Sequence, residues 1–452
     1  MLTIVSTVVG LSLLILVHEL GHFFAAKAVN IQVPRFSLGF GKRLAGFRVG
    51  ETEFVVSAIP LGGYVKMAGM EDDEAAEALE GSGEGYVVDP ERTFDSKPLW
   101  ARALVITAGV IMNLVFAFAV FTTLPLIYGE PVTPVTRVSI APAAELAGPG
   151  RELAVVPDGA TLTQVGTKPV TVWEDVYDAL RKAPAGPVQL RFSDAAPVTL
   201  NLPAARKPRR QMLNQLLPYR PAIIGEVITG LPAARAGIRP GDRVTQAGGQ
   251  PVHSWDQLVA IIHTHGGKPL PLVVERDGKP LALTVTPTSS PDTNALGERV
   301  TVGKIGAAPG PMPDKHRPAS VGTAVRIGAR STWNASVLIV GILKKLFTGE
   351  ISPRNMGGLL SIGEASGQTA AMGLEVWLTF LALFSVNLAV LNLLPIPILD
   401  GGHLMFLGFE AVRGRPLSIE ARIRLSQVGL VIVVALMIWA NGNDIARIVF
   451  GR

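Results

Sequence analysis

Val17-His18-Glu19-Leu20-Gly21-His22 closes an apolar run that begins at Leu2 and carries no charged side chain before His18. Residues four apart on an α-helix are separated by about 40° around its axis, so His18 and His22 project from one face and are able to share a metal ion. Glu19 lies between them, where it reaches a water molecule in preference to the metal. Ionisable side chains at the membrane centre cost about 2.5–3.5 kcal/mol each, so the stretch predicts a metal site on a membrane helix. The alternative is a polar cluster at the membrane edge, with Glu19 reaching water.

The pattern is H-E-x-x-H, and it predicts Zn²⁺ as the cofactor and Glu19 as the catalytic residue. Such a site needs a third protein ligand and one open position. The best candidate lies far along the chain, in Asn392-Leu393-Leu394-Pro395-Ile396-Pro397-Ile398-Leu399-Asp400-Gly401-Gly402-His403. Two prolines this close cannot continue a helix, because each lacks an N–H and its ring clashes with the preceding turn. The backbone is expected to open there and present Asp400, which we favour over its rival His403 as the third ligand.

Four apolar stretches are long enough to cross a bilayer, which takes about 20 residues. They are predicted as transmembrane helices over residues 1–30, 99–128, 374–396 and 425–450. No positive charge precedes the first, which argues against a signal peptide. Lys and Arg cluster after the first span and between the third and fourth. The positive-inside rule therefore predicts an outer N-terminus and an outer segment over residues 129–373.

The composition agrees with a membrane protein that also carries loop-rich parts. Hydrophobic residues make up 48% and charged residues only 17% of the chain, against about 25% charged residues in soluble domains. No block of Lys and Arg with interleaved aromatic residues is present, so a nucleic-acid partner has little support. The chain has no Cys, which excludes disulfides, thiolate metal ligands and a Cys nucleophile.

Residues 31–70 alternate apolar and polar side chains between glycines, as at Phe36, Leu38 and Phe40. This period of two predicts short β-hairpins. Residues 71–98 are acidic and rich in glycine and are expected to form a mobile linker. After the third predicted span, residues 397–424 are predicted as the Asp-Gly motif followed by a cytoplasmic loop.

The outer segment contains a weak internal repeat. Pro142–Gly148 is similar to Pro232–Gly237, and Pro169–Asp175 is similar to Pro251–Gln257. The second copy resembles the signature of bacterial PDZ domains, which bind peptides by adding a strand to a sheet edge. Residues 129–217 and 218–307 are therefore predicted as two PDZ domains, the alternative being two β-rich spacer domains. Residues 308–373 are predicted as an amphipathic or juxtamembrane segment, at the membrane surface or packed on the core.

Three asparagines fall within the apolar spans: Asn113 in the second, and Asn387 and Asn392 in the third. Each could simply form a hydrogen bond between helices. Asn392 is closest to the break at the prolines, so it is the best candidate to hold the substrate backbone or the oxyanion. Asn387 and Pro397 complete the predicted substrate-binding set.

The chain resembles the site-2 proteases over essentially its whole length. Two motifs together carry the resemblance: H-E-x-x-H in a first span and Asn-x-x-Pro-x-Pro-x-Leu-Asp-Gly at the end of a later one. The resemblance implies a multi-pass α-helical membrane protein with four transmembrane helices, a membrane-associated β-hairpin segment and two β-rich PDZ domains. It implies that His18, His22 and Asp400 bind zinc and that Glu19 is the general base. Asn392 would handle substrate, and Gly39–Met67 would receive the unwound substrate as an extra strand.

The resemblance also implies a zinc metalloendopeptidase of regulated intramembrane proteolysis and envelope stress signalling. Its partners would be the lipid bilayer and single-span membrane proteins already trimmed outside the membrane: an anti-sigma factor or remnant signal peptides. The expected location is the bacterial inner membrane, with periplasmic PDZ domains and the active site towards the cytoplasm. The first PDZ copy lacks a clear glycine-rich ligand loop near Gly148–Arg151, so the tandem is expected to act as a gate.

Two other classes of protein compete with this reading. A metal transporter also places His and Asp within the membrane, but the sequence offers no array of polar residues along a conduit. A non-catalytic membrane scaffold would present the PDZ domains and would not need Glu19.

Overall fold

The computed structural model describes residues 1–70, 87–140, 146, 148–293, 299–312, 315–349 and 357–450. Its contacts divide the chain into two compact units. The first combines Met1–Glu130 with Pro318–Arg452, and the second is Pro131–Arg317. Residues far apart in the sequence therefore meet in the first unit, which holds both motifs.

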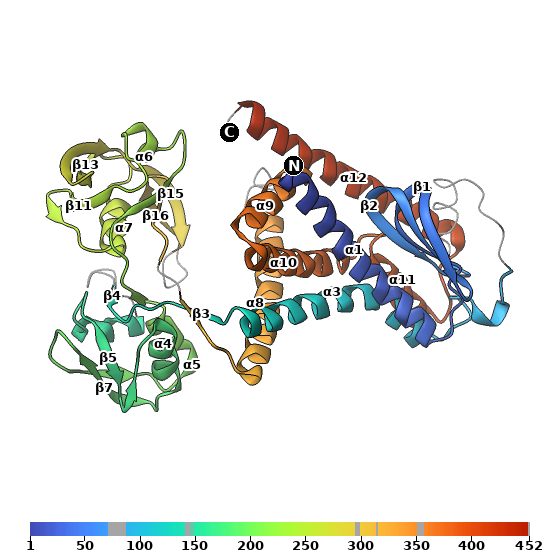
Figure 1. Ribbon diagram of the computed structural model, residues 1–452, viewed down its shortest axis with the longest axis horizontal. Helices are drawn as coiled ribbons and strands as arrows, with labels where there is room; N and C mark the ends of the chain where they lie inside the picture. The colour runs from blue at the N-terminus through green and yellow to red at the C-terminus, as the bar shows by residue number, and fades with distance from the viewer. Residues whose placement is uncertain are drawn as a thin grey trace. The chain divides into compact units, whose positions relative to one another are not determined.

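The first unit is mainly helical (Figure 1). Its helices are α1 (Leu2–Ala28), α3 (Leu99–Ile127), α8 (Val321–Phe347), α9 (Leu359–Met372), α10 (Leu374–Asn392), α11 (Asp400–Arg413) and α12 (Ile419–Phe450). Within the described residues, α1, α3, α10 and α12 are long and apolar enough to cross a membrane. The four predicted spans are thus confirmed by length and composition, and the chain is a multi-pass membrane protein. The last helix begins before residue 425, where its span was predicted to start.

Helices α1 and α3 pack closely at the H-E-x-x-H motif. A Cβ atom on Gly21 would lie only 2.3 Å from the backbone oxygen of Ala108, so only glycine allows this approach. Helix α3 also packs against α8, α10 and α11. It therefore brings the first motif and the last part of the chain to a common centre.

The strands predicted in residues 31–70 are present as β1 (Arg35–Val49) and β2 (Thr52–Lys66). Both strands bend, so their pairing is more complex than that of a simple two-stranded hairpin. Residues 43–49 pair with residues 52–57, whereas residues 35–38 pair with both 53–56 and 63–66. Gly39 and Gly41 permit the bend with φ angles of 95° and 83°, a region that side chains disfavour. Among the described residues, 63–66 pair on one side only and form an edge of this sheet.

The break at the prolines is present, but the loop predicted for residues 397–424 is wrong over most of its length. Helix α10 ends at Asn392, and Ile398 has a φ of 98°, which is rare for a β-branched residue. Asp400 then begins α11, a helix of 14 residues. Negative charge is stabilised at a helix N-terminus, and Phe406 and Leu407 on α11 are buried. The charge at the N-terminus and the buried apolar side chains stabilise a helix here, although the glycines after Asp400 suggest a loop.

The linker predicted over residues 71–98 needs a second correction. Residues 71–86 lie outside the described residues, but the part that follows is packed. Phe94 is buried, and its backbone N–H donates to the oxygen of Ala68. A short 3₁₀ helix, η1 (Pro90–Arg92), precedes it. Burial of one aromatic side chain and these backbone contacts tie the segment to the first unit.

Helices α8 and α9 occupy the predicted amphipathic segment, 308–373. Helix α8 packs on α3 and α10, with Ala324 and Ala335 buried. Trp333, Val337 and Leu338 on the same helix are exposed. Helix α8 thus packs on the core along one side. Packing on the core was one of the two alternatives for this segment.

The second unit contains the same sheet twice. One sheet has the order β6-β5-β7-β8 and the other β12-β11-β13-β14. In both copies a helix that starts at a tryptophan, Trp173 in α4 or Trp255 in α7, follows the second strand of the sequence. The first copy comprises β5 (Leu162–Val165), β6 (Lys168–Pro169), α4 (Trp173–Lys182), β7 (Gly186–Phe192) and β8 (Val198–Leu202); the second comprises β11 (Arg243–Ala247), β12 (Gln250–Pro251), α7 (Trp255–Thr264), β13 (Leu270–Arg276) and β14 (Lys279–Val285).

Each copy has its own apolar core. The remaining elements of this unit are β3 (Glu130–Val132), β4 (Val138–Ile140), η2 (Gly148–Val155), α5 (Arg206–Leu213), β9 (Leu216–Pro218), β10 (Ile224–Val227), α6 (Pro232–Arg235), β15 (Thr288–Thr293), β16 (Arg299–Lys304), β17 (Ala307–Pro309) and β18 (Lys315–Arg317). The repeat motif at Pro142–Gly148 falls largely outside the described residues, so the later motif alone can be compared between the copies.

Candidate metal and active site

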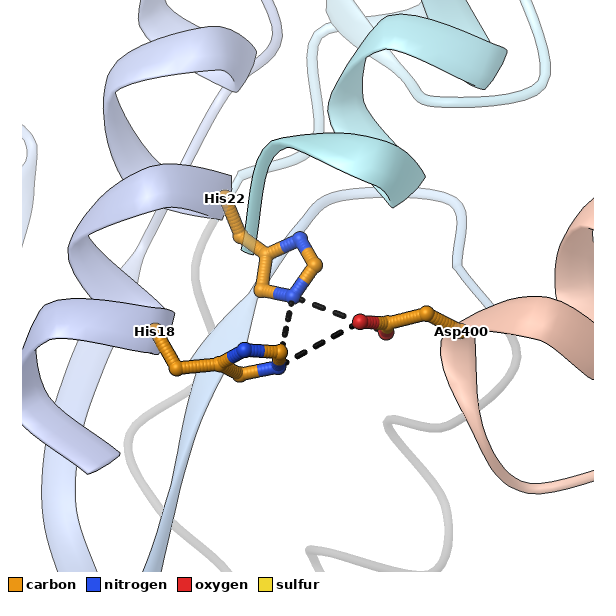
Figure 2. Close-up of side chains that lie close together, drawn as sticks. All are labelled: His18, His22 and Asp400. Atoms are coloured by element: carbon orange, nitrogen blue, oxygen red, sulfur yellow. Dashed lines mark hydrogen bonds and ion pairs between the residues drawn. The ribbon is translucent and has the colours of Figure 1, made fainter. Parts of the chain in front are cut away.

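Figure 2 shows His18, His22 and Asp400 pointing towards one another, the first two from α1 and the third from the start of α11. The two Nε2 atoms lie 3.2 Å apart. Asp400 Oδ2 lies 3.4 Å from Nε2 of His18, and Asp400 Oδ1 lies 3.6 Å from Nε2 of His22. One nitrogen from each imidazole and the carboxylate group of Asp400 thus converge from residues far apart in the sequence.

These distances fit a metal ion. Zinc bound at 2.0–2.2 Å in a tetrahedron keeps its ligand atoms about 3.3–3.6 Å apart. Asp400 Oδ2 is buried and has no hydrogen-bond partner among the described residues. A buried carboxylate oxygen without a partner is costly, and a cation removes that cost. The donor set of two imidazoles and one carboxylate is also the set that catalytic zinc sites use.

The protein orients His22 for this role. Nδ1 of His22 lies 2.8 Å from the backbone oxygen of Val105 on α3. The Nδ1–H must donate to that carbonyl, which leaves the Nε2 lone pair free and directed at the cluster. Helix α3 therefore fixes the tautomer of a side chain that belongs to α1.

Gly109 on α3 makes room for the cluster. A Cβ atom at this position would lie 2.4 Å from Nε2 of His22 and 2.7 Å from Cε1 of His18. Any side chain would thus occupy the space of the imidazole rings. A glycine in the middle of an otherwise apolar span was the available signal, since glycine weakens a helix unless packing requires it.

A cavity of about 260 Å³ opens at the cluster and is lined by Glu19, Asn392 and residues 63–67. Glu19 Cγ would lie 3.2 Å from a Cβ atom on Gly63, so the sheet edge passes directly beside this carboxyl group. The cavity therefore combines the metal ligands, a carboxylate and an extended backbone edge. This combination can hold a peptide bond next to a metal and a base.

Of the predicted substrate residues, only Asn392 is in this cavity. Its Nδ2 lies 3.4 Å from Nε2 of His18. Asn387 and Pro397 do not line the cavity. Pro397 packs against α12, because a Cβ atom on Gly429 of that helix would lie only 1.5 Å from the carbonyl oxygen of Pro397. His403 lines the cavity, but the group able to hold a metal contains Asp400 in its place.

Comparison with known proteins gives a family for the whole chain. The model of peptidase family M50 matches residues 6–436. The chain is 36% identical to the regulator of sigma-E protease RseP of Escherichia coli, over 98% of each chain. It is 37% identical to a putative zinc metalloprotease of Pasteurella multocida over 98% of each chain, and 34% identical to one of Ralstonia nicotianae over 99% of each. The resemblance drawn from the two motifs is confirmed: the chain belongs to peptidase family M50, and it is a metalloprotease of the site-2 type.

Proposed function

We propose that this protein hydrolyses a peptide bond inside the membrane, at a zinc ion held by His18, His22 and Asp400. The observation that carries the proposal is the convergence of two Nε2 atoms and one carboxylate within 3.6 Å of one another. Both histidines lie on α1, a helix long and apolar enough to span a bilayer, and the carboxylate belongs to Asp400 at the start of α11. Relatives named as zinc metalloproteases support the choice of metal.

The residues of the cavity divide the chemistry between them. Zinc, when bound, supplies a Lewis acid that polarises the scissile carbonyl and activates water. Glu19 takes the proton from the attacking water and returns it to the leaving amine as a general base and acid. Asn392, beside His18, holds the substrate backbone or the developing oxyanion through its amide N–H groups. Asn387 and Pro397 keep no direct role in this proposal, because they lie away from the cavity lining.

The sheet edge at residues 63–66 provides the place for the substrate. A transmembrane helix shields its peptide bonds, so it has to unwind before cleavage, and in lipid the freed backbone groups need new partners. An exposed strand edge supplies them by pairing with the substrate as an added strand. The edge lines the same cavity as Glu19 and the metal ligands, so pairing there would deliver an extended backbone to the site.

The names of the relatives support the proposed substrate class and setting. The regulator of sigma-E protease RseP is, by its name, a protease of a sigma-factor pathway. We therefore expect a bacterial inner-membrane enzyme that cuts the transmembrane segment of a pre-trimmed single-span protein, an anti-sigma factor or a remnant signal peptide, during envelope stress signalling. The active site would face the cytoplasm.

The two sheets of the second unit support two periplasmic PDZ domains over residues 129–217 and 218–307. Both sheets share one strand order, as duplicated domains would. We propose that the tandem acts as a gate for substrates that still carry a large outer domain.

Metal removal tests the function. A chelator is expected to abolish cleavage of a single-span model substrate by the detergent-solubilised full chain, and added Zn²⁺ is expected to restore it, because three ligands hold a metal that can be withdrawn. Product is measured by gel and mass spectrometry, with the cut site located within the apolar segment. Cleavage that persists in metal-free protein, or cuts confined to the soluble flanks of the substrate, would contradict the proposal.

Strand addition makes a separate prediction, and the absence of native cysteine makes it convenient to test. Val65→Cys should form disulfides with single cysteines placed along the substrate at every second position, because side chains alternate between the faces of a paired strand. Val49→Cys, in the part of β1 that pairs with residue 52, is the control and should give little cross-linking. A repeat of three to four residues would mean that the substrate binds as a helix.

A further inference from the structure

Asn113 on α3 is completely buried beside the metal cluster. Its amide nitrogen Nδ2 lies 3.2 Å from Nδ1 of His18. The backbone oxygen of Asn113 accepts a hydrogen bond of 2.9 Å from Ser385 Oγ on α10. The residue is thus fixed between three helices, and its side chain faces the first histidine of the motif.

The side-chain amide of Asn113, with Nδ2 facing His18, leaves two hydrogen-bonding problems. Asn113 Oδ1 is buried and has no hydrogen-bond partner among the described residues. If Nδ2 donated to Nδ1 of His18, a neutral imidazole would carry its proton on Nε2. That proton would point at Nε2 of His22, 3.2 Å away, and would block a metal. The oxygen and nitrogen of a side-chain amide have nearly the same size and shape, so they are assigned from their hydrogen-bond partners.

Exchanging the two amide atoms resolves both problems. Oδ1 then accepts the Nδ1–H of His18, and the Nε2 lone pair of His18 is free for a metal. His22 already has this arrangement with the oxygen of Val105, which lies two helical turns before Asn113 on α3. With this exchange, α3 supplies an oxygen acceptor to each histidine: Val105 to His22 and Asn113 to His18.

We infer that Asn113, through its side-chain oxygen, is the positioning residue that selects the metal-binding tautomer of His18. The inference rests on the proposed zinc site and adds to it a residue in the second span. Asn113 does not touch the metal or the substrate; it acts through His18. Partners that orient a metal-bound histidine in this way are worth about 10- to 100-fold in metal affinity.

The test compares zinc affinities of purified full-length variants by competition with a chelator. Asn113→Leu keeps the volume and removes the acceptor, and its affinity should fall by about 10- to 100-fold. Asn113→Asp keeps an acceptor oxygen and should restore the affinity to within about tenfold of the native value, as expected of carboxylate–histidine–zinc arrangements. Ser385→Ala, which removes a neighbouring buried hydrogen bond, is the control for local packing and should leave the affinity unchanged.

Thermal unfolding of the metal-free variants separates tautomer selection from loss of fold, because only the metal-loaded form depends on the His18 tautomer. An affinity of Asn113→Leu equal to the native value would overturn the inference, as would Asn113→Asp binding no better than Asn113→Leu. Either result leaves the proposed function standing, provided that the native protein binds zinc. A native protein that binds no zinc would instead refute the proposed function.

Discussion

Glu19→Gln is expected to slow cleavage of a single-span substrate strongly and to leave zinc binding intact. Glu19 lines the cavity at the metal cluster, but it does not belong to the group able to hold a metal. Glutamine has the same shape and cannot take a proton from water, so the loss isolates general-base catalysis. Such catalysis contributes about 10²- to 10⁴-fold, and the turnover number should fall by at least about 100-fold.

Turnover and bound zinc are measured on the same preparation of the full chain in detergent or liposomes. Glu375→Gln, at the start of α10 and away from the cavity lining, is the matched control and should retain activity. Unchanged cleavage by Glu19→Gln would eliminate the mechanism and would require a different general base. Loss of zinc together with activity would mean that Glu19 is a ligand.

Asp400→Asn is expected to lose both zinc binding and activity and to make the metal-free protein more stable. The substitution changes a charged oxygen donor into a neutral amide, which zinc rarely uses. Since second-shell partners alone are worth about 10- to 100-fold in affinity, loss of a direct ligand should exceed about 100-fold. Without metal, the buried Oδ2 of Asp400 lacks a hydrogen-bond partner among the described residues. Removing that charge relieves a burial cost.

Zinc affinity and the unfolding temperature, with and without zinc, measure the two effects. Binding of zinc to the folded form alone stabilises it by mass action, so Asp400→Asn should lose the zinc-dependent rise in unfolding temperature. His403→Gln is the control, because His403 lines the same cavity three residues further along α11. If His403→Gln loses zinc and Asp400→Asn keeps it, the third ligand has been misassigned.

Local sequence was a reliable guide wherever the decisive contacts are close along the chain. The four spans follow from long apolar runs, and all four are helices. The break after Asn392 follows from Pro395 and Pro397. Helix α11 was missed, because two glycines after Asp400 suggest a turn. They are there for another reason: Cβ atoms on Gly401 and Gly402 would lie 2.4 Å from backbone oxygens of the break.

The sheet shows the same limit. Alternating residues predicted strands between 31 and 70, but not that residues 35–38 lie between two other segments. Strand pairing depends on backbone bends at Gly39 and Gly41, and the identity of a glycine does not disclose which way the chain turns.

By itself the sequence determined that two histidines share one face of α1, because a spacing of four is set by the pitch of the helix. It also selected Asp400 by its chemistry and by the break before it. Only the tertiary structure decided that this carboxylate reaches the histidines, and that α3 contributes Gly109, Val105 and Asn113 to their surroundings. An apolar helix is compatible with many rotations about its axis. Packing against α1, α8, α10 and α11 fixes which of its residues face the metal site.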